Sequence, residues 1–432
     1  MERVYKTFPA SSKAFKAQQA LRWGGLHFEV CCYLNSNHHT QQNYPAYDQL
    51  LAIGAAETMP AGSSDAFEDL KNFSDKHQDW LFGYLSYDLK NQLEDLDSSN
   101  HDGLGFAQIH FFRPVILIIP KAGEVLIGCL PGFGPFSDPD QVYQQINAFA
   151  RPSVPSRPVK PVARVSKARY LEQMEAIHNH IHLGDIYEMN YCVEFFDRQA
   201  LIDPYLTYGK LNKLSPTPYS VFYKLDDKYL MCASPERFLK KQDDLLISQP
   251  IKGTAPRGAT PEEDRRLRED LFTNPKERSE NVMIVDLVRN DLSKVAEKNS
   301  VAVAELFGIY SFATVHQMIS TVTARLGKDH HFIDALRHAF PMGSMTGAPK
   351  VRAMQLIEQY EDTRRGLFSG AVGYISPDKD FDFNVVIRSI LYNQQAQYLA
   401  FLAGSAITAA SIPEQEYQEV LIKAQTMMKA LE

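Results

Sequence analysis

The stretch Leu245-Leu246-Ile247-Ser248-Gln249-Pro250-Ile251-Lys252-Gly253-Thr254 is the part of this 432-residue chain from which the fold can be inferred. Its apolar beginning, Leu245–Ser248, predicts a buried strand, and a lysine–glycine pair follows. A lysine at the end of such a strand can lose contact with water, which lowers its pKa and frees the amine as a nucleophile. A lysine that simply faces solvent is the competing interpretation.

Two predicted helices each carry two glutamates three residues apart. The first helix begins at Asn274-Pro275, where asparagine suits the N-cap and proline the first turn, and the second begins at Pro413. The paired glutamates are Glu277 and Glu280 on the first helix and Glu416 and Glu419 on the second. Because residues three apart share a helix face, each pair can present its carboxylates together.

Four carboxylates from two helices suit a hard divalent cation, and Mg²⁺ fits best because it binds carboxylates together with waters and an anionic substrate. Two simpler roles compete with metal binding. Glu277 can close a capping box at the start of its helix. Glu419 can pair with Lys423, four residues later on the same helix.

Other candidate residues also have an ordinary structural alternative. Glu236 is either a general acid or a paired surface acid. Arg388 ends an apolar run and is either a carboxylate clamp or a strand-end charge. His316 lies in an apolar stretch, where a lone histidine is more often structural. The loop Gly343–Lys350 can direct backbone N–H groups at an anion, or it is a plain turn before a helix.

Composition excludes several classes of protein. Apolar residues make up 44% and charged residues 22%, which is typical of globular chains, and a net charge of −7 argues against a broad nucleic-acid-binding face. The five cysteines form no C-x-x-C pair, which argues against a disulfide framework or a zinc ribbon. No signal peptide or membrane span is predicted, so we expect a cytoplasmic protein without membrane or nucleic-acid partners.

A proline-dense segment divides the chain. Residues 151–165 contain four prolines and predict a connector between residues 1–150 and residues 166–432. The expected elements are helices over Lys167–Leu183 and Lys350–Tyr360, a hairpin of Tyr219–Leu225 with Tyr229–Ala233, and strands over His27–Leu34, Trp80–Tyr87 and Phe381–Leu391.

Several motifs, taken in chain order, resemble those of the chorismate-binding enzymes over about residues 167–431. They are Gly184–Tyr187, Ser234–Phe238, Pro250–Thr254, Glu280–Leu287, Arg289–Leu292, Gly347–Met354, Gly370–Tyr374 and Glu416–Glu419. The resemblance implies an α+β fold, an α/β sandwich of two facing antiparallel sheets with helices outside. Residues 1–150 would complete that sandwich, and residues 166–432 would form the catalytic region.

Within this family, the lysine at position 252 resembles the motif of aminodeoxychorismate synthase component I. In anthranilate synthases the same motif looks like Pro-Ile-Ala-Gly-Thr, with alanine in place of the lysine. Phe82–Lys90 and Asn190 point to the same branch. The resemblance implies conversion of chorismate and ammonia to 4-amino-4-deoxychorismate, for p-aminobenzoate and folate synthesis. A separate glutamine amidotransferase subunit would supply the ammonia. The alternatives are anthranilate synthase component I and a non-catalytic chorismate-binding regulatory subunit.

The resemblance also implies roles for individual residues. Lys252 would attack C2 of chorismate while Glu236 protonates the leaving C4 hydroxyl, and ammonia would then attack C4 and expel the lysine. His316 would lie near the reacting ring. Contacts to the substrate would come from Arg388, Gly404, Lys423, Thr346, Gly253 and Thr254. Mg²⁺ would be held by Glu280 and Glu419, with Glu277 and Glu416 behind them. This chemistry requires a lowered pKa for Lys252 and a raised one for Glu236.

The sequence departs from the family pattern at three places. Glu188 stands where relatives often carry Gln, and where isochorismate and salicylate synthases carry the Lys that activates water. Phe368 replaces a frequent substrate-binding tyrosine, and Gly404-Ser405-Ala406 replaces a more glycine-rich loop. The absence of that Lys argues against isochorismate and salicylate synthase activity.

Overall fold

The computed structural model describes residues 2–9, 16–39, 44–45, 47–60, 62, 64–150, 152, 154–313 and 315–432. Its strands are β1 (Val4–Pro9), β2 (Val30–Asn35), β3 (Gln49–Thr58), β4 (Leu81–Leu85), β5 (Ile109–Lys121), β6 (Glu124–Cys129), β7 (Val162–Ala163), β8 (Glu188–Asp197), β9 (Tyr219–Leu225), β10 (Lys228–Ser234), β11 (Arg237–Gln242), β12 (Leu245–Gln249), β13 (Ile251–Pro256), β14 (Ala302–Ser311), β15 (Val315–Arg325), β16 (Gly347–Ala348), β17 (Ala371–Ile375), β18 (Phe381–Asn384), β19 (Ser389–Asn393) and β20 (Tyr398–Thr408).

The α-helices are α1 (Ala17–His27), α2 (Ala66–Lys76), α3 (Pro139–Ala148), α4 (Lys167–His182), α5 (Pro204–Leu214), α6 (Pro261–Thr273), α7 (Pro275–Ser293), α8 (Phe332–Ala339), α9 (Lys350–Tyr360) and α10 (Pro413–Leu431). Short 3-10 turns cover Tyr87–Gln92, Gly134–Ser137 and Gly343–Met345. None of these described helices is long and apolar enough to cross a bilayer.

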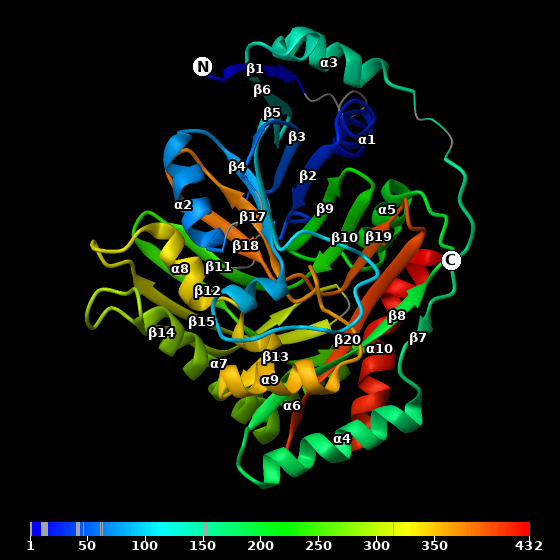
Figure 1. The fold of residues 1–432 in the computed structure, drawn as a ribbon, viewed down its shortest axis with the longest axis vertical. Coiled ribbons are helices and arrows are strands. Elements are labelled where there is room, and N and C mark those ends of the chain that lie inside the picture. Colours follow the sequence, from blue (N-terminus) through cyan, green and yellow to red (C-terminus); the bar gives the residue numbers. More distant parts are fainter. Residues whose placement is uncertain are drawn as a thin grey trace.

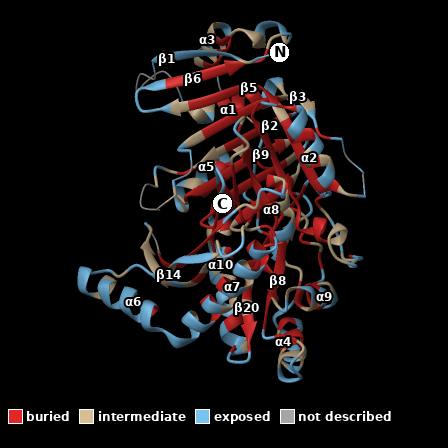
Figure 2. Ribbon diagram, turned by 90° about the vertical axis from the view of Figure 1, so that its left-hand side faces the viewer, coloured by how far each residue is buried: buried red, intermediate tan, exposed pale blue. Residues whose placement is uncertain are grey.

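The expected α+β fold is confirmed, with strands at the centre and helices around them (Figure 1). Hydrogen-bonded ladders link the described strands into one network of 20 strands, and neighbouring strands such as β10 and β19, β4 and β17, and β8 and β20 pair in antiparallel fashion. The two faces expected as separate sheets are therefore continuous with one another. Buried residues concentrate in the strands, whereas α6 and the outer faces of α7 and α4 are exposed (Figure 2).

Strands from the first 150 residues pair directly with strands from the rest of the chain. β2 pairs with β9, and β4 pairs with β17. The predicted connector contains no helix in its described part; it forms backbone hydrogen bonds from Arg157 to Leu201 and from Val159 to Leu431, and then the short β7. Arg151 and Ser153 of that connector lie outside the described residues.

Two predicted strands differ from the structure. Phe381–Leu391 is interrupted, because residues 385–388 leave the strand between β18 and β19 and Arg388 has a left-handed backbone with φ of 51°. His27 ends α1, so the strand predicted from His27 begins only at Val30. Periodicity along the chain does not show where a strand begins or where a buried segment bends.

Candidate active site

The site lies where β13 packs against α7 and meets the first residue of β8. The turn between β10 and β11, which carries Glu236, borders the same region. β13 pairs with β15 in an interrupted register, with partners at Ile251 and Thr254 but none for the two residues between them. Those two residues are Lys252 and Gly253. This irregularity frees the lysine from a regular ladder, and its side chain is buried.

Gly253 allows the close approach of α7 to this strand. Its φ is +96°, a left-handed conformation that side chains rarely adopt. A Cβ atom here would lie 3.0 Å from Glu277 Oε2 and 3.1 Å from Leu271 Cδ1. The glycine therefore supports the geometry of the site, and the structure places a carboxylate of the predicted metal cluster directly beside it.

Lys252 forms a buried ion pair with Glu188. Its Nζ lies 2.5 Å from Glu188 Oε1, and both side chains are buried. Burial lowers the pKa of Lys252, but the carboxylates of Glu188, Glu280 and Glu236 outweigh burial and raise it above the ordinary value. The expectation of a lowered pKa is therefore wrong for this arrangement, because burial was considered without the acids that the fold places around the amine.

Glu236 is buried close enough to Lys252 for their charges to interact. The next residue, Arg237, donates to both carboxylate oxygens of Asp382 at 2.8 Å and to Gln249 at 2.6 Å, so it anchors the turn to β18 and β12. Burial raises the pKa of Glu236 to about 7, despite opposing hydrogen bonds from Ser344 and the Ile251 backbone. This is the direction that a proton donor at neutral pH needs.

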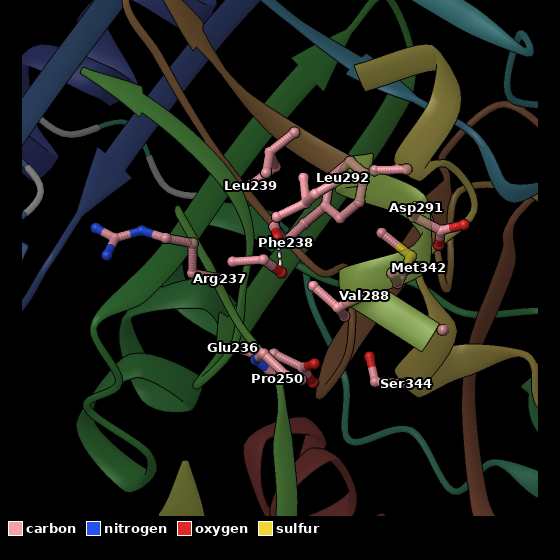
Figure 3. A pocket seen from close by; sticks show the side chains of 13 residues that line it. Glu236, Arg237, Phe238, Leu239, Pro250, Val288, Asp291, Leu292, Met342 and Ser344 are labelled. Carbon is pink, nitrogen blue, oxygen red and sulfur yellow. Dashed lines mark hydrogen bonds between the residues drawn. The ribbon is translucent and has the colours of Figure 1, made fainter. Parts of the chain in front are cut away.

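A small cavity of about 20 Å³ lies next to Glu236 (Figure 3). Glu236 and Ser344 lie at one end of the view, and Arg237 points away from the cavity. The rest of its wall is largely apolar and includes Val288, Leu292 and Met342. The volume is enough for one molecule of the size of water.

The four predicted metal ligands gather around an ammonium group. Lys276 Nζ lies 3.8 Å from Glu280 Oε1 and 3.6 Å from Glu416 Oε1, and the charges of Glu277 and Glu419 also act on it. Burial raises the pKa of Glu280 to about 7 and raises that of Glu277. Burial also acts to raise the pKa of Glu419, but the nearby lysines, Lys423 first, lower it overall.

These carboxylates have the chemistry for a hard cation. Glu280 Oε1 is buried and has no hydrogen-bond partner among the described residues, as expected of a ligand atom that lacks its ion. In the described part of the chain, however, no three His, Cys, Asp or Glu side chains converge closely enough to ligate one ion as they stand. Lys276, which the sequence analysis did not single out, lies between them. Its position four residues before Glu280 was the available signal.

Three predicted substrate contacts lie near one another. Lys423 Nζ donates to the Gly404 carbonyl oxygen at 2.9 Å and pairs with Glu419 at 2.6 Å, so the i,i+4 alternative for that glutamate is observed. Arg388 has no ion-pair partner within the described ranges, and burial lowers its pKa while Glu419 opposes this. A desolvated guanidinium without a counter-ion is suited to an anionic ligand.

His316 is fixed by protein groups on both sides of its ring. Nδ1 lies 2.8 Å from Ser311 Oγ, and Nε2 lies 3.0 Å from Asp264 Oδ1 at the start of α6. Arg257 holds the same aspartate through two hydrogen bonds of 2.7 and 2.9 Å. In this arrangement both ring nitrogens are engaged by protein groups, and the side chain is buried. No motif or spacing in the sequence distinguishes Asp264 as its partner.

Two other predicted contacts are placed differently. The Thr346 hydroxyl is buried and donates within its own loop, to the Met342 and Gly343 carbonyls at 3.3 Å. Thr254 is exposed on β13. The loop Gly343–Lys350 instead brings Ser344 to Glu236, a contact that the sequence analysis missed because nothing in the motif distinguishes this serine.

A match to a family model covers almost the whole chain. The model for "chorismate binding enzyme" matches residues 29–429. The chain belongs to the chorismate-binding enzyme family. The resemblance inferred from the motifs is thus confirmed.

Curated relatives within the family carry two kinds of name. Aminodeoxychorismate synthase component 1 of Bacillus subtilis is 33% identical over 371 residues, which cover 82% of this chain and 77% of that protein. Anthranilate synthase component 1 of Thermus thermophilus is also 33% identical, over 363 residues, with 82% and 77% covered.

Other relatives are more similar but are matched over less of their length. The probable chloroplastic aminodeoxychorismate synthase of rice is 42% identical over 275 residues, and the match spans 63% of this chain but only 30% of that protein. Aminodeoxychorismate synthase component 1 of Klebsiella aerogenes is 41% identical over 270 residues, with 62% and 59% covered.

Solved structures share the fold at lower identity. Anthranilate synthase component I from Streptococcus pneumoniae has a TM-score of 0.77 at 24% identity and covers 90% of this chain and 94% of its own. MenF, the menaquinone-specific isochorismate synthase from Escherichia coli, has a TM-score of 0.79 at 18% identity, with 100% and 94% covered. These matches support the predicted fold class.

Proposed function

We propose that this chain is component I of an aminodeoxychorismate synthase, which converts chorismate and ammonia to 4-amino-4-deoxychorismate for p-aminobenzoate and folate synthesis. The observation that carries this proposal is the burial of Lys252 and Glu236 close enough for their charges to interact, because covalent catalysis of this kind needs an amine and a proton donor at one site. The relatives with this name in Bacillus subtilis and Klebsiella aerogenes support the same branch.

In the proposed reaction, Lys252 Nζ forms a bond to C2 of chorismate and the ring double bonds shift toward C4. The C4–O bond breaks, and Glu236 donates the proton that lets the hydroxyl leave as water. Ammonia then forms a bond to C4, the double bonds shift back, and the C2–N bond to Lys252 breaks. The new C4 ammonium group gives one proton to the Glu236 carboxylate, which restores the acid. Because Glu236 has a pKa of about 7, it holds its proton at neutral pH far more often than an ordinary glutamate.

Binding of the two substrate carboxylates is assigned to the cationic side of the site. Arg388, without a counter-ion in the described residues, and Lys423 would hold one anionic end. Glu280 and Glu419, supported by Glu277 and Glu416, would hold Mg²⁺, which neutralises the other carboxylate when bound. The ammonia would come from a separate glutamine amidotransferase subunit.

Product identification tests the proposal. Purified chain would be incubated with chorismate, Mg²⁺ and ammonium, beside Lys252→Ala and the exposed control Lys328→Ala, and the products separated by chromatography and mass spectrometry. We expect aminodeoxychorismate without anthranilate, lost in Lys252→Ala and kept in Lys328→Ala. Anthranilate from the unaltered chain would assign it to the other branch. No turnover of chorismate would favour a regulatory subunit.

A further inference from the structure

Glu188 is a buried acid that contacts Nζ of Lys252, the proposed nucleophile. It is the first residue of β8, paired on one side with Ala348 of β16 and on the other with Thr408 of β20, so its backbone is fixed by two ladders. Its side chain is only 1% exposed to solvent. Oε1 contacts Lys252 Nζ at 2.5 Å, and Oε2 has no hydrogen-bond partner among the described residues.

The surroundings of Lys252 create a chemical problem for a nucleophile. The acids around it favour the protonated amine, and an ammonium group has no lone pair with which to attack. Burial keeps bulk water from removing the proton. The acids whose charges act on Lys252, or on which its charge acts, are Glu188, Glu236, Glu277, Glu280 and Glu419.

Of these five acids, only Glu188 both contacts the Lys252 amine and has no other part in the proposed chemistry. Glu236 must carry a proton when it acts as an acid, so it cannot also accept one at that step. Glu277, Glu280 and Glu419 belong to the proposed cation cluster around Lys276. Glu188 lies within hydrogen-bonding distance of the lysine, outside that cluster, and has one oxygen unused.

We propose that Glu188 is the catalytic base that takes the proton from Lys252. This inference rests on the proposed function. One N–H bond of the Lys252 ammonium breaks as an O–H bond forms on Glu188, which leaves a neutral amine beside a neutral carboxylic acid. The nitrogen lone pair then forms the bond to C2. When ammonia later expels the lysine, Glu188 returns its proton to the departing amine, so the pair is restored after each turnover.

The pH dependence of Glu188→Gln separates a base from a simple counter-charge. With saturating Mg²⁺, chorismate and ammonium, we expect kcat at pH 7 to fall by about 100-fold or more. Below about pH 7 the rate of the variant should rise with pH, up to about tenfold per unit, as hydroxide replaces the missing base, whereas the unaltered chain should be nearly flat there. Above about pH 7 the rise should level off, because Glu236 loses its proton. If Glu188 only neutralised Lys252, its removal would lower the pKa of the lysine and leave activity at pH 7 unchanged or higher, which would overturn the proposal.

A matched control shows what loss of a buried lysine–carboxylate pair does by itself. Glu358 lies 2.7 Å from the fully buried Lys90, in an ion pair that plays no part in the proposed chemistry. Glu358→Gln should keep the wild-type pH profile, whatever its effect on stability. A pH profile of Glu188→Gln that simply parallels the wild type and this control would also contradict the inference.

A second variant covers the case in which Glu188→Gln does not fold. Glu188→Ala leaves room for a small carboxylate, so added formate should restore a measurable part of the rate, whereas chloride should not. No recovery with formate in a folded, chorismate-binding variant would count against a base at this position. Failure of the proposed function is seen separately, because the unaltered chain would then not form aminodeoxychorismate.

Discussion

Glu236 illustrates how burial sets the chemistry of a single side chain. Its pKa is raised to about 7 because a carboxylate is poorly solvated in this position. As a proton donor it acts only when protonated, so we expect kcat of the unaltered chain to fall as pH rises above about 7, toward tenfold per unit. The measurement is a pH–rate profile with Mg²⁺ saturating, so that Glu280 is held ionised.

The control for this profile is Glu236→Gln, which keeps the size of the side chain but has no acidic proton. We expect it to lose about 10²- to 10⁴-fold in kcat and to lose the descending limb with a pKa near 7. A descending limb that persists in this variant would show that another group sets it.

Arg388 gives a second prediction at the scale of one residue. It has no ion pair within the described part of the chain, so its replacement breaks no internal salt bridge. If it holds a substrate carboxylate, Arg388→Met should raise KM for chorismate by about 10- to 100-fold, which corresponds to roughly 1.5–3 kcal/mol for a charged hydrogen bond. The melting temperature should change little. A variant with unchanged KM would remove Arg388 from the binding site.

At the scale of elements, α7 and α10 bring four acids around Lys276. The ammonium group lies where it competes with a divalent cation for the same carboxylates. We therefore expect Lys276→Met to bind Mg²⁺ at least about tenfold more tightly in isothermal titration calorimetry, since a positive charge about 4 Å from the ligands is removed.

Lys294→Met is the matched control for that titration. Lys294 caps the other end of α7 and pairs with Asp291 at 3.2 Å, so it carries the same charge far from the four acids. Its replacement should leave Mg²⁺ affinity unchanged. Weaker Mg²⁺ binding in Lys276→Met would show instead that this lysine holds the carboxylates in place for the ion.

At the scale of the whole molecule, the first 150 residues and the rest share one core. The apolar cluster that contains Phe82, Leu85 and Phe111 of β4 and β5 also contains Phe238 of β11 and Phe383 of β18. A core that both parts complete cannot be divided without exposing apolar surface to water.

We therefore expect residues 166–432 expressed alone to show no cooperative thermal transition, whereas the full chain should unfold in a single calorimetric peak. The control is a full chain with a protease site between residues 154 and 158, cleaved only after folding. The two pieces should remain associated, because the ladders β2–β9 and β4–β17 persist. A cooperative transition in the isolated fragment would contradict this expectation.

Sequence reasoning predicted local features well where a short segment contains its own signal. The hairpin of β9 and β10, the start of α7 at Asn274 and the helix Lys350–Tyr360 are all observed. In α7 the Asn274 side chain accepts hydrogen bonds from the Lys276 and Glu277 backbone, as an N-cap should. The family was identified from motifs in the same way.

The sequence by itself therefore determined the fold class, the family and the residue types available for catalysis, because these depend on local pattern and motif order. Only the tertiary structure decided which charges meet. It placed Glu188 against Lys252, 64 positions apart, and so reversed the expected direction of the pKa shift of the lysine. It also set Lys276 among acids from α10. Electrostatic energies depend on distance and burial in space, and spacing along the chain specifies neither between distant elements.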